Sequence, residues 1–177
     1  MKKNLLIIAA VMAVVTFANV KAKAQASPIS STAVPLSIVL GDAVSITMES
    51  TPAVEFRYTT PANYIGSRLV SKPAHFSVFS NRTYTLSVKA DAAFQVPTVG
   101  PTIPLSAVKV AVNSSDPIGL TGSAVALSTT DATLITPAPS TLGTSFTIDY
   151  TIPTSTPLLL VTAGTYTTNV IYTVTQL

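Results

Sequence analysis

The sequence predicts an all-β protein folded as a two-sheet sandwich, and three observations indicate this. Beyond the N-terminal segment, no apolar pattern recurs with the 3.6-residue period of a helix. Instead, short runs rich in Val, Ile, Thr and Tyr alternate apolar and polar residues, and Pro, Gly, Asn and Asp separate them. Because each half-buried strand must cover its apolar face with a second sheet, we expect about eight or nine short antiparallel strands in an immunoglobulin-like or jelly-roll sandwich.

The alternating runs define the predicted strands. Within residues 41–177 nine runs cover residues 44–48, 54–58, 76–78, 84–88, 108–112, 125–127, a short piece around Leu134, 146–152 and 166–174, and a further run at residues 34–40 precedes them. The last run has the clearest alternation and continues to the end of the sequence. Since proline cannot donate a hydrogen bond inside a central ladder, the Pro-containing stretches 97–104 and 137–143 are expected to be long loops or segments that switch sheets.

The N-terminus has the pattern of a cleavable signal peptide that spans residues 1–24. Two lysines precede an apolar run over residues 5–17, and an Ala-Lys-Ala triplet ends the segment. Lys21 and its neighbours interrupt the run before it reaches the roughly 20 apolar residues of a spanning helix. We therefore expect a mature chain that begins at Gln25, is exported to the periplasm, the outer surface or the medium, and inserts no segment into the membrane.

The composition of the mature chain favours association with other proteins. Six basic residues face seven acidic ones, a net charge of −1, so no basic patch remains for nucleic acid or an anionic membrane. The chain has no cysteine, so the single domain expected over residues 41–177 must depend on its core. Threonine, serine and alanine fill the outward positions, and the strand edges lack the lysines that discourage strand addition. Such a surface favours packing against copies of itself or against another surface protein.

We find no pattern of catalytic or metal-binding residues. The sole histidine, His75, has no catalytic motif around it and is expected at a strand edge or in a loop; a hydrolase would need it beside a nucleophile and an acid. The acids are scattered, and the only mild calcium-loop candidate, residues 113–116, is more simply a turn. The glycines are not clustered into a phosphate-binding loop. We therefore expect no catalytic site, metal or cofactor.

The tyrosines are the remaining candidates for ligand contact, because the chain has no tryptophan. Most of the six tyrosines occupy the inward phase of their predicted strands, where core packing is the simplest role. Tyr64 follows the Pro61-Ala-Asn63 turn and is expected to be the most exposed. It is therefore a candidate residue in a ligand-binding loop.

The segment 25–40 is a candidate for assembly. Its last part alternates apolar residues with Pro35, Ser37 and Val39. Pro35 lies in the outward phase and removes one backbone donor, which places this strand at an edge or makes it switch sheets. The small polar stretch 25–33 before it is either a loose terminus or an extension into a neighbouring subunit.

The end of the chain also carries a family resemblance. The run Ala163-Gly-Thr-Tyr-Thr-Thr-Asn-Val-Ile-Tyr-Thr-Val-Thr175 resembles the terminal Gly-x-Tyr strand of the spore coat U and archaic chaperone–usher pilin group. The segment 80–89 is similar to part of small secreted β-domains of Gram-negative bacteria. The resemblance is loose over the domain and best over residues 163–175, and the paired cysteines common in that group are missing. It implies that residues 25–40 act as a donor segment that completes a neighbour's sheet, with a periplasmic chaperone as a further partner.

We expect, in sum, a secreted, non-catalytic structural or surface-assembly subunit of fimbrial or coat type. Its predicted assembly residues are Val34, Leu36, Ile38 and Leu40 in the N-terminal segment and Tyr166, Val170, Tyr172 and Val174 in the final strand. The alternative is a monomeric secreted module that binds a glycan or a partner protein through the loops around Tyr64 and Ser114.

Overall fold

The computed structural model describes residues 29–95, 100–114 and 122–177. The predicted signal peptide lies outside these residues, so its prediction stays untested. The chain divides into two units, Met1–Val39 and Leu40–Leu177. In the first unit, the described residues 29–39 form no helix or strand and their side chains are exposed. The second unit is a β-sandwich and contains all the buried apolar residues of the described chain.

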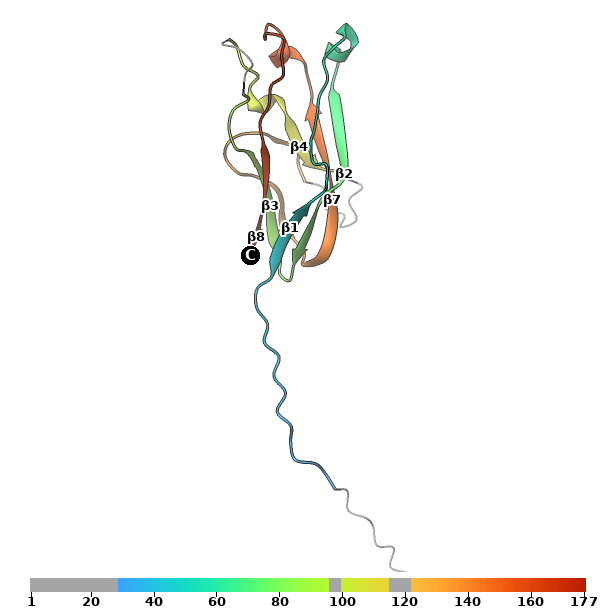
Figure 1. Cartoon of the computed structure of the whole chain (residues 1–177), viewed down its shortest axis with the longest axis vertical. Helices are drawn as coiled ribbons and strands as arrows, with labels where there is room; N and C mark the ends of the chain where they lie inside the picture. Colours follow the sequence, from blue (N-terminus) through green and yellow to red (C-terminus); the bar gives the residue numbers. More distant parts are fainter. Residues whose placement is uncertain (1–28, 96–99, 115–121) are drawn as a thin grey trace, which may run out of the picture. The chain divides into compact units, whose positions relative to one another are not determined.

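Eight strands and three short 3-10 helices make up the described part of the sandwich (Figure 1). They are β1 (Val44–Met48), η1 (Pro61–Tyr64), β2 (Arg68–Ser80), β3 (Tyr84–Ala90), η2 (Leu105–Ala107), β4 (Lys109–Val112), β5 (Val125–Ala126), β6 (Ala132–Ala138), β7 (Thr141–Ile152), η3 (Thr156–Leu158) and β8 (Val170–Gln176). The strand order is β1-β2-β7-β4-β5 in one sheet and β6-β3-β8 in the other, and every pairing is antiparallel. The predicted all-β, two-sheet architecture is confirmed.

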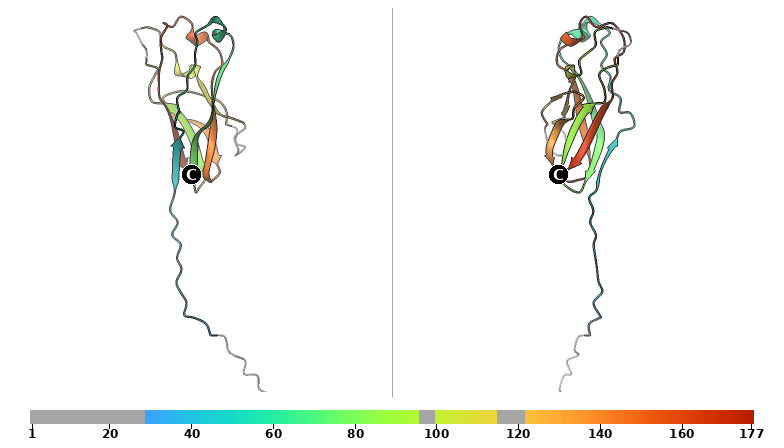
Figure 2. Two further views of the ribbon diagram at one scale, coloured as in Figure 1. Left: turned by 45° about the vertical axis from the view of Figure 1, so that its right-hand side comes forward. Right: turned by 90° about the vertical axis from the view of Figure 1, so that its left-hand side faces the viewer.

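The two sheets lie face to face (Figure 2). The alternation in their strands places one face of each sheet in a common core. In β3, Leu86 and Val88 are buried while the intervening Ser87 is only partly covered. In β7, Phe146, Ile148, Tyr150 and Ile152 are buried in the same way. Each large side chain removed from water contributes about 1.5–3 kcal/mol, so these residues provide much of the driving force for packing the sheets together.

Two of the predicted strands are wrong. Residues 34–40 form no strand. Residues 54–58 show the alternating burial expected of a strand, but they pair with no other strand. Val54, Phe56 and Tyr58 still pack against the core, so the predicted phase is correct although the predicted pairing is not.

Strand β2 is longer than predicted, because it begins at Arg68 and not near Phe76. The first half of β2 was not predicted because it contains Ser71, Lys72 and Pro73, which interrupt the alternation of apolar and polar residues. Of the 137–143 stretch, residues 137–138 end β6 and residues 141–143 begin β7, so only residues 139–140 lie between the two strands. Because β6 and β7 belong to different sheets, the chain switches sheets here, which is one of the two expectations, and it forms no long loop.

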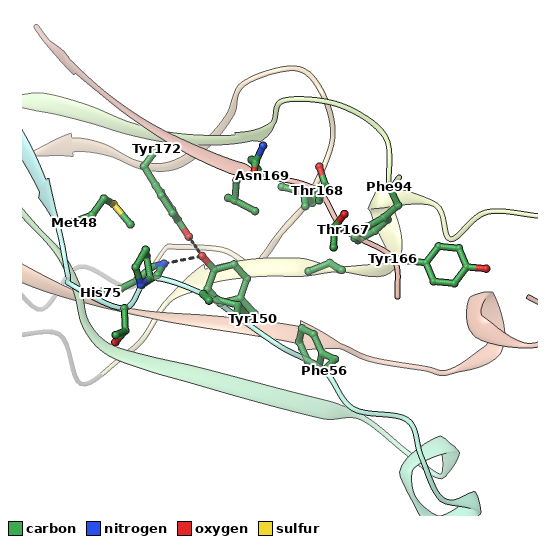
Figure 3. A pocket seen from close by; sticks show the side chains of 17 residues that line it. Met48, Phe56, His75, Phe94, Tyr150, Tyr166, Thr167, Thr168, Asn169 and Tyr172 are labelled. Atoms are coloured by element: carbon green, nitrogen blue, oxygen red, sulfur yellow. Dashed lines mark hydrogen bonds between the residues drawn. The ribbon is translucent and has the colours of Figure 1, made fainter. Parts of the chain in front are cut away.

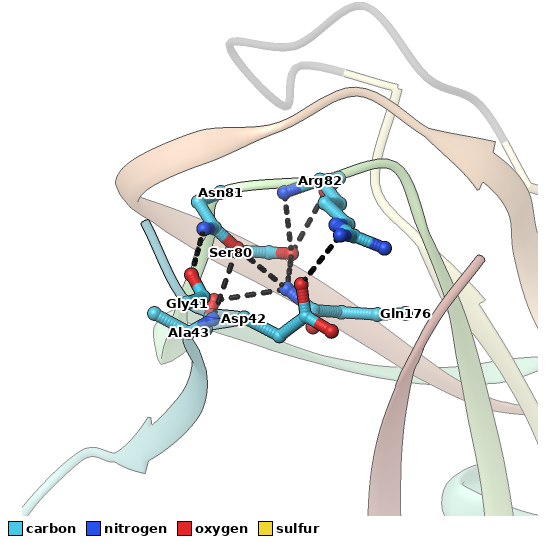
Figure 4. A network of polar contacts seen from close by, with 7 residues as sticks. All are labelled: Gly41, Asp42, Ala43, Ser80, Asn81, Arg82 and Gln176. Carbon is cyan, nitrogen blue, oxygen red and sulfur yellow. Dashed lines mark hydrogen bonds and ion pairs between the residues drawn. The ribbon is translucent and has the colours of Figure 1, made fainter. Parts of the chain in front are cut away.

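A polar network fixes the place where the chain enters the sandwich (Figure 4). The side-chain amide of Gln176 lies 2.9 Å from Ala43 O, 3.0 Å from Ser80 Oγ and 2.9 Å from Asn81 Oδ1, so its two N–H groups are shared among three acceptors. Asn81 Nδ2 donates to Gly41 O at 2.8 Å. The start of the sandwich is thereby held beside the C-terminal end of β8.

Candidate assembly site

One side of the sandwich has an open seam between its two sheets. β1 is an edge strand of the five-stranded sheet, β8 is an edge strand of the three-stranded sheet, and the two lie close together (Figure 1). β8 pairs with β3 from Ala90↔Val170 to Tyr84↔Gln176, and no described strand pairs with its other edge. Because an edge strand presents unpaired N–H and C=O groups, β8 has one side available for an additional strand.

The chain that follows β1 borders this seam without completing it. Glu49 N donates to His75 O at 3.0 Å, the last backbone contact of this run. Residues 50–58 make no backbone–backbone hydrogen bond with another described segment. Val54 and Phe56 hold the segment against the core through their side chains. It therefore covers the core but leaves the β8 edge unpaired.

A cleft with a volume of about 580 Å³ opens between this segment and residues 166–172 (Figure 3). This volume is within the range of protein sites that bind apolar groups. Its lining is largely apolar and includes Met48, Val54, Phe56, Phe94, Val170 and Tyr172. The cleft thus joins an open strand edge to a surface that accepts apolar side chains.

A chain of hydrogen bonds crosses the sandwich beside this cleft (Figure 3). His75 Nδ1 lies 2.9 Å from Glu49 Oε1, and His75 Nε2 lies 2.9 Å from the Tyr150 hydroxyl. The Tyr150 hydroxyl is in turn 2.5 Å from the Tyr172 hydroxyl. When Nδ1 carries the proton, Tyr172 donates to Tyr150, Tyr150 donates to His75, and His75 donates to Glu49, so every member has a partner.

His75 occupies an irregular part of β2, which corrects the prediction of an edge or loop position. The residue is only 1% exposed. Ala74 has a φ of 49°, and the register with β7 shifts between Lys72 and Phe76. This bulge breaks the alternation, so that His75 and Phe76 are both buried although they are adjacent in the sequence.

Burial and hydrogen bonding shift the pKa values of the groups in this hydrogen-bonded series. The hydrogen bonds from His75 and then Lys72 lower the pKa of Glu49. Burial raises the pKa of Tyr150 to about 12 and raises the pKa of Tyr172 as well. An acid and a hydroxyl do flank His75, as the hydrolase hypothesis requires. The hydroxyl, however, is a phenol that burial keeps protonated. The geometry therefore favours a structural link between the two sheets over an activated nucleophile.

The other wall of the cleft is held by polar contacts. Asp91 accepts hydrogen bonds from the backbone N–H of Asn169 at 3.1 Å and from its side-chain amide at 2.7 Å, and these bonds lower the pKa of Asp91. Thr167 forms an isolated antiparallel bridge with Gln95. The regular strand therefore begins at Val170 and not at Tyr166 as predicted, while residues 166–169 are fixed to a neighbouring loop.

The structure brings together only the second of the two predicted groups of assembly residues. Tyr166, Val170 and Tyr172 line the cleft, and Val174 packs against the core. The first group is exposed: Val34 by 83%, Leu36 by 87%, Ile38 by 78% and Leu40 by 87%. Sequence reasoning singled out His75 but did not foresee its partners Glu49 and Tyr150, because no local signal indicates contacts between residues so far apart in the chain.

The predicted ligand loop is only partly described. Tyr64 is 37% exposed, and its ring lies 5.1 Å from that of Tyr58. Ser114 is exposed, while residues 115–121 lie outside the described chain. Within the described ranges, no three His, Cys, Asp or Glu side chains gather to hold a metal ion. The same ranges contain no helix that is long and apolar enough to cross a membrane.

Comparisons with known proteins identify similar chains among the solved structures. No family model matches the sequence, and no curated protein matches it. Among solved structures, the chain is similar to a chain from the structure of a chaperone–usher pilus, with a TM-score of 0.42 and 9% sequence identity. The match covers 85% of this chain and 100% of that chain.

Proposed function

We propose that the protein is an exported, non-catalytic structural subunit that assembles when the N-terminal segment of one copy adds to the β8 edge of another. One observation carries the proposal: an unpaired strand edge borders an apolar cleft of about 580 Å³, and the same chain carries an exposed segment with strand-like alternation. In β-augmentation, backbone hydrogen bonds to the edge provide affinity and pockets for alternate side chains provide specificity.

The alternation of the N-terminal segment fits such a strand. In a strand, Val34, Leu36, Ile38 and Leu40 point to one face and so would enter the cleft together. The N–H groups of alternate residues also point to the same neighbouring strand. If the segment pairs with β8 through the N–H groups of Leu36 and Ile38, the nitrogen of Pro35 faces away from β8. The N–H that proline lacks is then not needed for this pairing.

The β8 edge lacks two of the features that commonly block strand addition, namely charged side chains and proline. Residues 170–176 contain no charged side chain and no proline. Proteins that must remain monomeric commonly protect their edges with such residues. An open apolar cleft is a liability before assembly, so a periplasmic chaperone that covers it forms part of the proposal.

The test compares two substitutions in the N-terminal segment, in a chain that begins at Gln25. Leu36→Asp together with Ile38→Asp places charges on the face that enters the cleft, whereas Ser37→Asp places one on the outward face. Electron microscopy and size-exclusion chromatography should show assemblies for the parent and for Ser37→Asp, and monomers for the double variant. Monomers in all three samples would refute the proposal.

The alternative function is a monomeric module that binds a glycan or a partner protein through the loop of Tyr64. The observation that favours it is the partial exposure of Tyr64 at the end of η1. A stable monomer whose ligand binding is lost on Tyr64→Ala would establish this second function in place of the first.

A further inference from the structure

Four aliphatic side chains project from one end of the sandwich. Ile65 is 78% exposed, Leu69 60%, Leu159 54% and Leu160 96%. Ile65, Leu159 and Leu160 belong to the loops that contain η1 and η3, at the top of Figures 1 and 2, and Leu69 is the second residue of β2. We call these four residues the apolar tip. All four are more than half exposed in the described chain.

The two loops of the apolar tip are held together. β2 begins where β7 ends, with Arg68 opposite Ile152, so both loops leave the same pair of strands. Ser155 Oγ donates to Tyr64 O at 2.5 Å and links one loop to the other. Asn63 Oδ1 accepts a hydrogen bond from Thr60 N at 3.0 Å and closes the η1 turn. The exposed side chains therefore project from a formed turn.

Leu160 has an unusual backbone conformation for its exposure. Its φ is 65°, in the left-handed region that residues other than glycine, asparagine and aspartate rarely adopt. A buried leucine could offset such strain by packing, but this one is 96% exposed. Conformational strain of this kind is often found where a ligand or partner is contacted.

The two segments that carry the apolar tip contain almost no charge. Residues 58–71 and 150–168, which form both loops and their supports, contain Arg68 as their only charged residue. The nearest acids along these segments are Asp149, inside β7, and Glu55, which pairs with Arg57 at 2.9 Å. No carboxylate of these two segments therefore opposes the approach of a phosphate-bearing surface.

We propose that the apolar tip inserts into the interfacial region of a lipid bilayer. Side chains that project singly need no shaped pocket in a partner, and a bilayer accepts them without one. Tyr64, which is 37% exposed at the end of η1, is the residue type that favours the boundary between headgroups and acyl chains. The contact is a shallow one by loop side chains, unlike a spanning helix, and without a basic patch it depends on apolar burial and not on anionic lipid.

The experiment uses vesicles of zwitterionic phosphatidylcholine and the chain from Gln25 onward, which retains the whole sandwich and lacks the apolar run at residues 5–17. Since the sequence has no tryptophan, Leu160→Trp introduces the sole indole reporter. Its emission should shift to the blue and resist aqueous quenchers when vesicles are added. The matched control is Leu142→Trp, at a side chain that is 89% exposed outside the tip, and its emission should not change.

A second pair of variants measures affinity by vesicle sedimentation. Leu160→Asp and Ile65→Asp should each weaken binding by roughly tenfold or more, whereas Leu142→Asp should not. The proposal is overturned if the parent stays in the supernatant, if Leu142→Asp weakens binding equally, or if the tip variants abolish self-association and not vesicle binding. These variants leave the N-terminal segment and the cleft intact, so this result is independent of the proposed assembly.

Discussion

Residues 34–40 and strand β8 have a similar alternation of apolar residues, but only β8 is paired and has a buried face. In β8, Tyr172 is 9% exposed and pairs with Val88 of β3. In the N-terminal segment, Leu36 is 87% exposed and no secondary structure forms. The pattern alone therefore indicates what a segment can bury, while the presence of a partner strand decides whether it does so.

This difference has a physical cause. A single strand gains little by itself, because its backbone groups are already hydrogen-bonded to water and its ordering costs about 1–2 kcal/mol per residue. β8 recovers that cost through the ladder with β3 and the core beneath it. Residues 29–39 have no such partner in the described chain, so their alternation is consistent with a partner that a second molecule supplies.

The largest expected effect separates the two regions by stability. Tyr172→Ala removes a buried ring and should lower the free energy of unfolding by about 3–5 kcal/mol. Leu36→Ala, in an exposed segment, should change it by less than about 0.5 kcal/mol. Chemical denaturation of the chain from Gln25 onward measures both values. A comparable loss for Leu36→Ala would mean that the segment packs within its own chain.

The next effect concerns the hydrogen bonds that run from Glu49 through His75 and Tyr150 to Tyr172 and so join β8 to the other sheet. His75→Ala removes the partner of Tyr150 and Glu49 and leaves a cavity, so it should lower the free energy of unfolding by about 3 kcal/mol. The control is Arg82→Ala, which breaks an exposed ion pair with Asp42 and should cost about 0.5 kcal/mol or less. If thermal or denaturant unfolding showed equal losses for the two variants, the buried hydrogen bonds of His75 would stabilise the fold no more than an exposed ion pair does.

A smaller effect is expected at the end of β8. Gln176→Ala removes the amide that links β8 to Ala43 and Asn81 and should lower the free energy of unfolding by about 1 kcal/mol. Hydrogen exchange should rise first at residues 41–44 and at the last residues of β8. Faster exchange spread evenly over the sandwich would contradict the local role of this network.

The smallest effect is a dependence of stability on pH. The pKa of Glu49 is lower in the folded chain than its ordinary value of 4.5. Glu49 therefore stabilises the fold above pH 4.5, and this contribution is lost as the pH falls through the lowered value. Asp91 acts in the same direction. Denaturation at a series of acidic pH values should show a shallower slope for Glu49→Gln than for the parent; an unchanged slope would contradict this assignment.

The sequence was sufficient for the fold class but not for the site. Alternation in β3, β7 and β8 identified the core faces, because burial there follows the period of two directly. It failed at His75, where a bulge buries two consecutive residues, and at Tyr58, where an inward phase exists without a ladder. Both failures arise from contacts with residues far away in the chain, which local periodicity does not encode.

The most direct test of the central claim is disulfide trapping between two populations of the chain from Gln25 onward, which has no cysteine of its own. One population carries Ser37→Cys, and the other carries Ile171→Cys, Thr173→Cys or Thr175→Cys on the outward face of β8. Our account predicts a mixed disulfide at one β8 position, in yield well above that of a Leu142→Cys population. Yields no higher than that control at all three positions would contradict strand addition to the β8 edge.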